Sequence, residues 1–303
     1  MTKILSVAAL LTCLVLSPSA AAGGDIFDRV EHGYAENHGV NIHYVTRGRG
    51  PLIVLLHGFP DFWYGWRDQI RVLSHRYTVA ALDLRGYNLS DKPRGVEQYG
   101  ITTLAGDAAA VIRDLGFDRA IIVGHDWGGG IAWTFAAIYP EMTEALIVLQ
   151  TPHPRGLLRE LRTNPEQLAR SAYARTFQED GTHLGLSAEG LAAVVTDPLA
   201  HRRFVEAYER SDFEAMLNYY KANYPREPYA DVPLPNIQAP VLIMHGEDDP
   251  FLLAAGHNGV WDWVDAPVTV EMIPGVGHFI QQDASSRVTR TIYLWLRQLR
   301  RRG

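Results

Sequence analysis

Residues 120–130, which read AIIVGHDWGGG, decide the fold of this chain. The first four residues form an apolar run of strand length, and the glycines after them mark a tight turn into a helix. Small residues on both sides of Asp126 permit a strained strand-to-helix turn that lifts its side chain above the edge of a sheet. The helix N-terminus offers backbone N–H groups to negative charge. The stretch favours a carboxylate nucleophile over the alternative, a glycine-rich turn with a structural aspartate.

Short apolar runs alternate with helical patterns on both sides of this stretch, which is typical of a parallel α/β sheet. The strands are expected at residues 41–46, 52–56, 77–84, 120–123, 145–150, 241–245 and 268–273, and the helices at 63–73, 104–115, 127–139 and 288–299. From about 151 to 236 the pattern is helical and polar, without convincing strands. We therefore expect an α/β core in two parts, residues 23–150 and 238–303, with a helical cap, residues 151–237, inserted after the sixth strand.

The composition is that of a soluble globular enzyme. The 303 residues are 47% hydrophobic and 20% charged, and the formal net charge is −6. No basic stripe is visible, which argues against a nucleic-acid partner. The basic run Arg300–Arg302 is interpreted as a solvated tail.

The N-terminus is typical of a secretory signal peptide. Lys3 gives a positive start, residues 4–16 are apolar but too short to anchor in a bilayer, and Ala20–Ala22 supply the small residues that a signal peptidase requires. Cleavage after Ala22 would leave a periplasmic or secreted protein with no membrane attachment. The single cysteine, Cys13, lies within this segment, so the mature chain would have neither a disulfide nor a thiolate metal site.

Two further loops complete a catalytic order. Residues 246–250, Gly-Glu-Asp-Asp-Pro, follow one expected strand, and residues 275–278, Gly-Val-Gly-His, follow another. Nucleophile, acid and histidine then occur in the chain order of the α/β-hydrolase triad, each at the carboxyl end of a strand. We assign Asp249 as the acid and His278 as the base, with Asp248 and Glu247 as competitors for the acid.

An aspartate nucleophile selects the chemistry. A carboxylate attacks carbonyl carbons poorly, but it suffices for an alkyl carbon that bears a strained or good leaving group. The product is an ester of Asp126, which water activated by His278 must hydrolyse. The resulting oxyanion needs donors, and the backbone N–H groups of Phe59 and Trp127 stand in the positions that supply them in this fold.

The chain resembles the α/β-hydrolase superfamily from about Phe27 to Leu299, and within it the epoxide hydrolases. The resemblance is carried by His57-Gly58-Phe59-Pro60, Arg85-Gly86-Tyr87 with residues 90–93, Gly124–Gly129, Thr151–Pro154, Gly275–His278, and the cap segments Tyr173–Glu179 and Leu217–Tyr220. It implies a mostly parallel eight-stranded sheet flanked by helices.

The resemblance also implies the remaining site residues. Two cap tyrosines hold the epoxide oxygen in this family, and they correspond to Tyr173 and Tyr220. Tyr219 competes with Tyr220, because neighbours on a helix point about 100° apart. The substrate pocket is assigned to His57, Pro60, His153 and Phe177, although His57 and His153 are also expected to brace loops by hydrogen bonds. The substrates are a small molecule and water, with no cofactor and no metal, in a monomer or homodimer.

Three rival functions follow from the same residues. Haloalkane dehalogenases share the aspartate, but they commonly carry an asparagine as a second halide donor where this chain has Phe59. Fluoroacetate dehalogenases carry an arginine after the nucleophile, where this chain has Trp127. A non-catalytic binding protein would have no use for His278 and Asp249 together.

Overall fold

The computed structural model of the protein describes residues 24–302. The expected signal peptide, residues 1–22, lies outside them. Within the described range, no helix combines the length and the apolar character that a membrane crossing requires.

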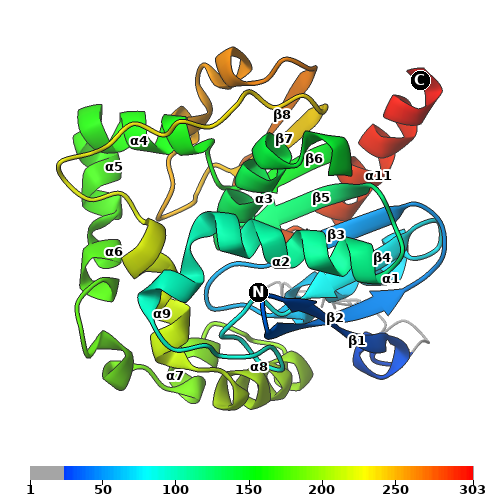
Figure 1. Ribbon diagram of the computed structural model, residues 1–303, viewed down its shortest axis with the longest axis horizontal. Coiled ribbons are helices and arrows are strands. Elements are labelled where there is room, and N and C mark those ends of the chain that lie inside the picture. Colours follow the sequence, from blue (N-terminus) through cyan, green and yellow to red (C-terminus); the bar gives the residue numbers. More distant parts are fainter. Residues whose placement is uncertain (1–23, 303) are drawn as a thin grey trace, which may run out of the picture.

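A single mixed sheet of eight strands runs through the centre of the molecule (Figure 1). Its strands are β1 (Glu31–Asn37), β2 (Val40–Arg47), β3 (Leu52–Leu56), β4 (Thr78–Leu82), β5 (Ala120–His125), β6 (Thr143–Leu149), β7 (Val241–Gly246) and β8 (Val268–Ile273). Their spatial order is β1-β2-β4-β3-β5-β6-β7-β8. Only the β1–β2 and β2–β4 pairs are antiparallel, so the carboxyl ends of β3 to β8 meet at one edge of the sheet.

Successive side chains of a strand point to opposite faces of the sheet, and in the central strands both sets are buried. On β3, Leu52, Val54 and Leu56 enter one hydrophobic core, whereas Ile53 and Leu55 enter the other. The first core is covered by α2 (Ile101–Asp114) and α3 (Trp127–Ile138), and the second by α1 (Arg67–Leu73) and α11 (Ser285–Arg302). This two-sided burial explains why these strands read as continuous apolar runs. The sheet is therefore a rigid support for the loops at its edge.

Between β6 and β7 the chain forms a layer of helices and no strand. These helices are α4 (Pro154–Thr163), α5 (Pro165–Arg170), α6 (Ala172–Phe177), α7 (Ala188–Ala192), α8 (Pro198–Arg210) and α9 (Phe213–Asn223). Several start at local signals, such as Pro165 after the capping side chain of Asn164 and Pro198 after that of Asp197. Figure 1 shows this layer along one side of the molecule, and we call it the cap.

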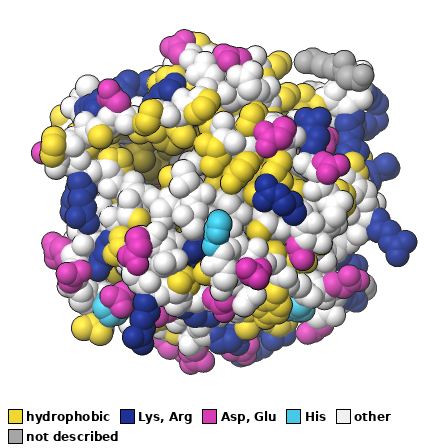
Figure 2. All heavy atoms as spheres, in the orientation of Figure 1, with side chains coloured by type: hydrophobic (Ala, Val, Ile, Leu, Met, Phe, Trp, Pro, Cys, Tyr) yellow, Lys and Arg dark blue, Asp and Glu magenta, His cyan; other side chains and the backbone are white. Residues whose placement is uncertain are grey.

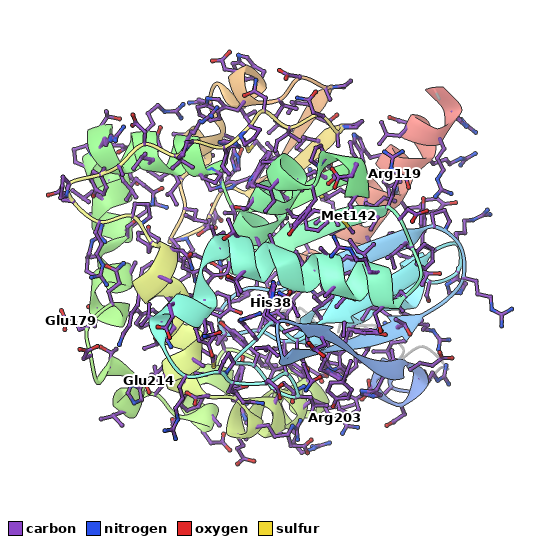
Figure 3. All side chains as sticks on the ribbon, viewed as in Figure 1. His38, Arg119, Met142, Glu179, Arg203 and Glu214 are labelled. Carbon is purple, nitrogen blue, oxygen red and sulfur yellow. The ribbon has the colours of Figure 1, made fainter. Side chains whose placement is uncertain are left out.

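The cap is fastened to the beginning of the described chain through α8. The guanidinium of Arg203 lies 3.9 Å from the centre of the Phe27 ring and 3.5 Å from Oδ2 of Asp25. Figure 3 labels Arg203. Glu179 and Glu214 mark the outer side of the cap in the same view. The remaining 3₁₀ turns, and α10 (Ile280–Asp283), are short connections within this frame.

The expected fold class is confirmed, with differences at the margins. Strand β1 was not among the strands expected from the pattern of apolar residues. The helix expected over residues 63–73 is a 3₁₀ turn (Trp63–Trp66) followed by α1. Expected strand 77–84 is shorter, at Thr78–Leu82, and expected strand 145–150 begins two residues earlier and ends before Gln150.

Candidate active site

Asp126 occupies the turn between β5 and α3. Its backbone has φ 52° and ψ −120°, which is rare for a residue with a side chain and is held by its surroundings. The amide N–H groups of Gly129 and Gly130 donate to its carbonyl oxygen, and so does the Thr151 hydroxyl, at 2.8 Å. The strained turn places the carboxylate above the sheet edge, as the sequence predicted.

Gly58 lets the neighbouring loop approach this carboxylate. A Cβ atom on Gly58 would lie 2.2 Å from Cβ of Asp126, so a side chain there would collide with the aspartate. The close approach brings the Phe59 N–H to 2.8 Å from Oδ1 of Asp126. Trp127 is the first residue of α3, and a helix leaves its first N–H groups without internal partners. Both predicted oxyanion donors therefore lie beside the nucleophile.

His278 and Asp249 complete the arrangement. Nδ1 of His278 lies 2.8 Å from Oδ2 of Asp249, and its Nε2 lies 3.5 Å from Oδ2 of Asp126. The second oxygen of Asp249 accepts from the N–H groups of Phe251 and Leu252. Asp248 and Glu247 are exposed, whereas Asp249 is buried. The geometry thus selects Asp249 among the three candidate acids.

The two carboxylates control the charge of His278. Burial alone would lower the pKa of His278, but the hydrogen bonds and charges of Asp126 and Asp249 outweigh it and raise the pKa to about 9. Burial would raise the pKa of Asp126, but the hydrogen bond and charge of His278 outweigh burial and lower it. At neutral pH the resting site therefore holds an imidazolium between two carboxylates, and Asp126 is ionised.

Two cap tyrosines face the nucleophile across a cavity. Tyr173 of α6 and Tyr220 of α9 both line it together with Asp126, and their ring centres lie 6.0 Å apart. Burial raises the pKa of each phenol well above its ordinary value, so both stay protonated. Tyr219 points elsewhere, because its hydroxyl donates to the Arg85 carbonyl oxygen at 2.8 Å. Of the two neighbours on α9, Tyr220 is the one that faces the site.

The cavity has a volume of about 370 Å³ and is mostly apolar. Figure 2 shows a hollow bordered by hydrophobic side chains at the upper left of the view. Besides the residues named above, the wall includes Ile101, Thr134, Leu157, Asn223, Tyr224, Val232, Leu234 and Leu252. The sequence analysis assigned none of these eight residues to the pocket.

One wall of the cavity is the irregular segment 224–236, which we call the wall loop. Two arginines of α4 hold it by its backbone. Arg155 donates to the carbonyl oxygens of Val232 and Leu234, and Arg162 donates to that of Tyr229 at 2.7 Å. The sequence analysis placed this segment in the cap but did not assign it to the site.

None of the four residues assigned to the substrate pocket is among those that line this cavity. His57 is buried, and its two ring nitrogens are bonded to the Gly58 carbonyl and the Leu84 N–H. His153 caps α4 and stacks on Trp263, 4.8 Å away, so both histidines brace loops. Phe177 packs on the rings of Phe59, Tyr173 and Tyr220. Pro60 borders a second cavity.

Among residues 24–302, no group of three or more histidine, cysteine or acidic side chains is arranged to hold a metal ion. The described site is built from a carboxylate, a histidine–aspartate pair, backbone donors and two phenols. These groups can form and hydrolyse an ester on Asp126 while donating a proton to an oxygen.

Comparison with known proteins agrees with this geometry. A family model described as alpha/beta hydrolase fold matches residues 51–285. The chain is 35% identical to epoxide hydrolase 3 of Xenopus tropicalis, over 88% of this chain and 78% of that protein. It is 32% identical to epoxide hydrolase 4 of Mus musculus, over 88% and 79% respectively. The chain belongs to the epoxide hydrolase family.

A solved structure of this family extends the likeness to three dimensions. An epoxide hydrolase variant from Bacillus megaterium, complexed with its product (R)-3-[1]naphthyloxy-propane-1,2-diol, superposes with a TM-score of 0.82 at 35% identity. The match covers 88% of this chain and all of that one. The overall fold of this chain is therefore that of an epoxide hydrolase.

Proposed function

We propose that this protein opens small organic epoxides to vicinal diols through a covalent ester on Asp126. The observation that carries the proposal is the placement of one carboxylate between two groups. His278 lies 3.5 Å from it on one side, and two protonated phenols face it across an apolar cavity. The first group serves ester hydrolysis, and the second serves ring opening.

In the first step, Oδ2 of Asp126 attacks a ring carbon, and the bond from that carbon to the epoxide oxygen breaks. Oδ1 stays on the Phe59 N–H, 2.8 Å away, and becomes the carbonyl oxygen of the ester. The departing oxygen takes a proton from Tyr220 or Tyr173, which are the two hydroxyl donors of the cap that we assign to it. The dry, apolar wall strengthens these hydrogen bonds.

Ester formation changes the charge balance at His278. The neutral ester no longer offers His278 the negative charge of Asp126, so its pKa falls from about 9 and it releases a proton. This proton replaces the one that the tyrosine gave. The neutral imidazole then takes a proton from water, and the hydroxide adds to the ester carbonyl carbon.

The oxyanion that forms accepts from the N–H groups of Phe59 and Trp127. Its collapse breaks the bond to the alkyl oxygen, which takes the proton of the added hydroxyl group, so that the diol leaves, Asp126 is again a carboxylate and His278 keeps its charge. No cofactor or metal takes part in this scheme. A halide would find a weaker site, because Phe59 offers no side-chain N–H as a second donor beside Trp127.

The test is to trap the ester. The variant His278→Gln should react once with styrene oxide and gain the mass of one epoxide on the peptide that contains residues 120–130, whereas Asp126→Asn should gain none. Wild-type protein should convert the epoxide to diol, and Asp126→Ala should not. Full activity of Asp126→Ala would refute the proposal. Halide release from chloroalkanes without diol formation would indicate a dehalogenase instead. Absence of an adduct on His278→Gln with both epoxides and chloroalkanes would favour a binding protein.

We further propose that residues 1–22 direct export and are removed, which would place the enzyme in the periplasm or outside the cell. The support is the charge, length and small-residue pattern of that segment alone. N-terminal sequencing of protein exported from a bacterial host should begin at Gly23. We also propose a monomer or homodimer, which sedimentation can decide.

A further inference from the structure

Gln150 stands directly after β6 in a conformation that few residues adopt. Its φ is 68°, and the Thr151 N–H donates to the Leu149 carbonyl oxygen, which closes a γ-turn around it. The residue is fully buried. A residue with a side chain held at positive φ costs on the order of 1–3 kcal/mol, so its surroundings must stabilise it.

Each hydrogen-bonding group of Gln150 is engaged, and the side chain joins two turns. Its Oε1 accepts from the Gly246 N–H at 2.8 Å, and its Nε2 donates to the Gly277 carbonyl oxygen at 2.6 Å. Its backbone N–H donates to Met244, and its carbonyl oxygen lies 3.1 Å from Nδ1 of His245. One amide therefore bridges the turn that leads to Asp249 and the turn that ends in His278.

These two turns are also in direct backbone contact. A Cβ atom on Gly246 would lie 2.4 Å from the Val276 carbonyl oxygen and 2.6 Å from that of Gly277. The Asp248 N–H donates to the Val276 carbonyl oxygen at 3.0 Å. Because this contact is between backbone atoms, it fixes the position of the Gly277 backbone, which leads directly into His278. The bond from Gln150 to Gly277 is the side-chain restraint on that position.

We infer that Gln150 is a positioning residue that holds His278 in place for hydrolysis of the ester. The inference rests on the proposed two-step reaction. Ring opening uses Asp126 and the cap tyrosines, and Gln150 has no hydrogen bond to any of them. Ester hydrolysis depends on His278, whose Nε2 must share a water with the ester carbon. A displacement of about 1 Å in such a group can cost on the order of 100-fold in rate.

The alternative is that Gln150 merely stabilises the fold, and two variants separate the roles. Gln150→Met keeps the length of the side chain but removes both hydrogen bonds. Gln150→Gly also removes them, while glycine tolerates a φ of 68° without strain, so this variant keeps the backbone turn. Thr143→Val is the control. Thr143 is also buried, it stands at the opposite end of β6, and its hydroxyl donates to the Tyr139 carbonyl oxygen at 3.0 Å, away from the triad turns.

Single-turnover kinetics with styrene oxide, quenched for mass spectrometry, measure ester formation and ester hydrolysis separately. In both Gln150 variants we expect ester formation within about threefold of wild type, and hydrolysis slower by about 10- to 100-fold, so that the ester accumulates. Thr143→Val should keep both rates, whatever its melting temperature.

Equal slowing of both steps in Gln150→Gly, or no slowing of hydrolysis in either Gln150 variant, would overturn the inference. The same would follow if Thr143→Val accumulated as much ester as the Gln150 variants. A wild-type protein that forms no ester would instead overturn the proposed function, so the two failures are distinguishable.

Discussion

Replacing the hydroxyl of Tyr220 tests the ring-opening step most directly. In Tyr220→Phe, one of the two phenols that face Asp126 can no longer donate to the departing oxygen. A hydrogen bond to a charged group is worth about 1.5–3 kcal/mol, which corresponds to about 10- to 150-fold in rate. Ester formation should slow by that factor, and ester hydrolysis should stay within about threefold. Stopped-flow fluorescence can follow the first step, because the Trp127 ring lies 4.9 Å from that of Tyr220.

Tyr219→Phe is the matched control on the same helix. Its hydroxyl donates to the buried Arg85 carbonyl oxygen, so the variant should lose about 1–3 kcal/mol of stability and melt a few degrees lower. Its rate of ester formation should equal that of wild type. The assignment fails if Tyr220→Phe forms the ester at the wild-type rate, or if Tyr219→Phe slows it by as much.

Two further predictions concern the nucleophile. Asp126→Asn removes one of the two carboxylates that raise the pKa of His278, so an NMR titration should find a pKa below about 9, and a value still near 9 would contradict the charge balance proposed above. A histidine with a raised pKa stabilises the folded state most at pH values below its ordinary pKa of 6.5, and this stabilisation is lost as the pH rises through about 9. Asp126→Asn should therefore lose the stabilisation from His278 at a lower pH than wild type does. Gly58→Ala puts a methyl group 2.2 Å from Cβ of Asp126, so ester formation should fall at least about tenfold and stability by about 1–3 kcal/mol. Gly185→Ala, where a methyl group meets no atom within 4 Å, should change neither, and equal effects of the two alanines would count against the close approach.

The triad could be predicted because its signals are local. The strands before Asp126 and Asp249 are buried throughout, and β8, before His278, is a partly exposed edge strand. Each strand reads as an apolar run, and each triad member has a glycine within three residues that permits a tight turn. Those two features need no knowledge of distant contacts. The choice of Asp249 over Asp248 was open in the sequence, because both residues fit the loop and only burial against His278 separates them.

Strand β1 escaped prediction because it lies at the sheet edge. Its seven residues are mostly exposed and polar, and their pairing with β2 depends on a two-residue turn. In that turn His38 and Gly39 both have positive φ, at 51° and 79°, which suits a tight hairpin. A histidine before glycine is a weaker signal for this turn than asparagine or aspartate would be.

The orientations of Tyr219 and Tyr220 and the lining of the cavity depend on tertiary contacts, which the sequence pattern does not show. Which tyrosine meets the nucleophile depends on where α9 settles, and the Arg85 carbonyl oxygen decides it by accepting from Tyr219. The lining depends on how the wall loop is placed, and no periodicity marks that loop. Of the four residues assigned to the pocket, His57 and His153 brace loops, Phe177 ends α6, and Pro60 borders a second cavity.

The wall loop is anchored through its backbone, whereas its side chains line the cavity. Arg155 and Arg162 donate hydrogen bonds to carbonyl oxygens, a group that every amino acid supplies, and Val232 and Leu234 border the cavity. Substitutions at those two positions can change the shape of the cavity while the hydrogen bonds to the backbone persist. An enzyme built in this way can acquire new preferences among its substrates by drift in a few wall side chains, without rebuilding the scaffold that carries its chemistry.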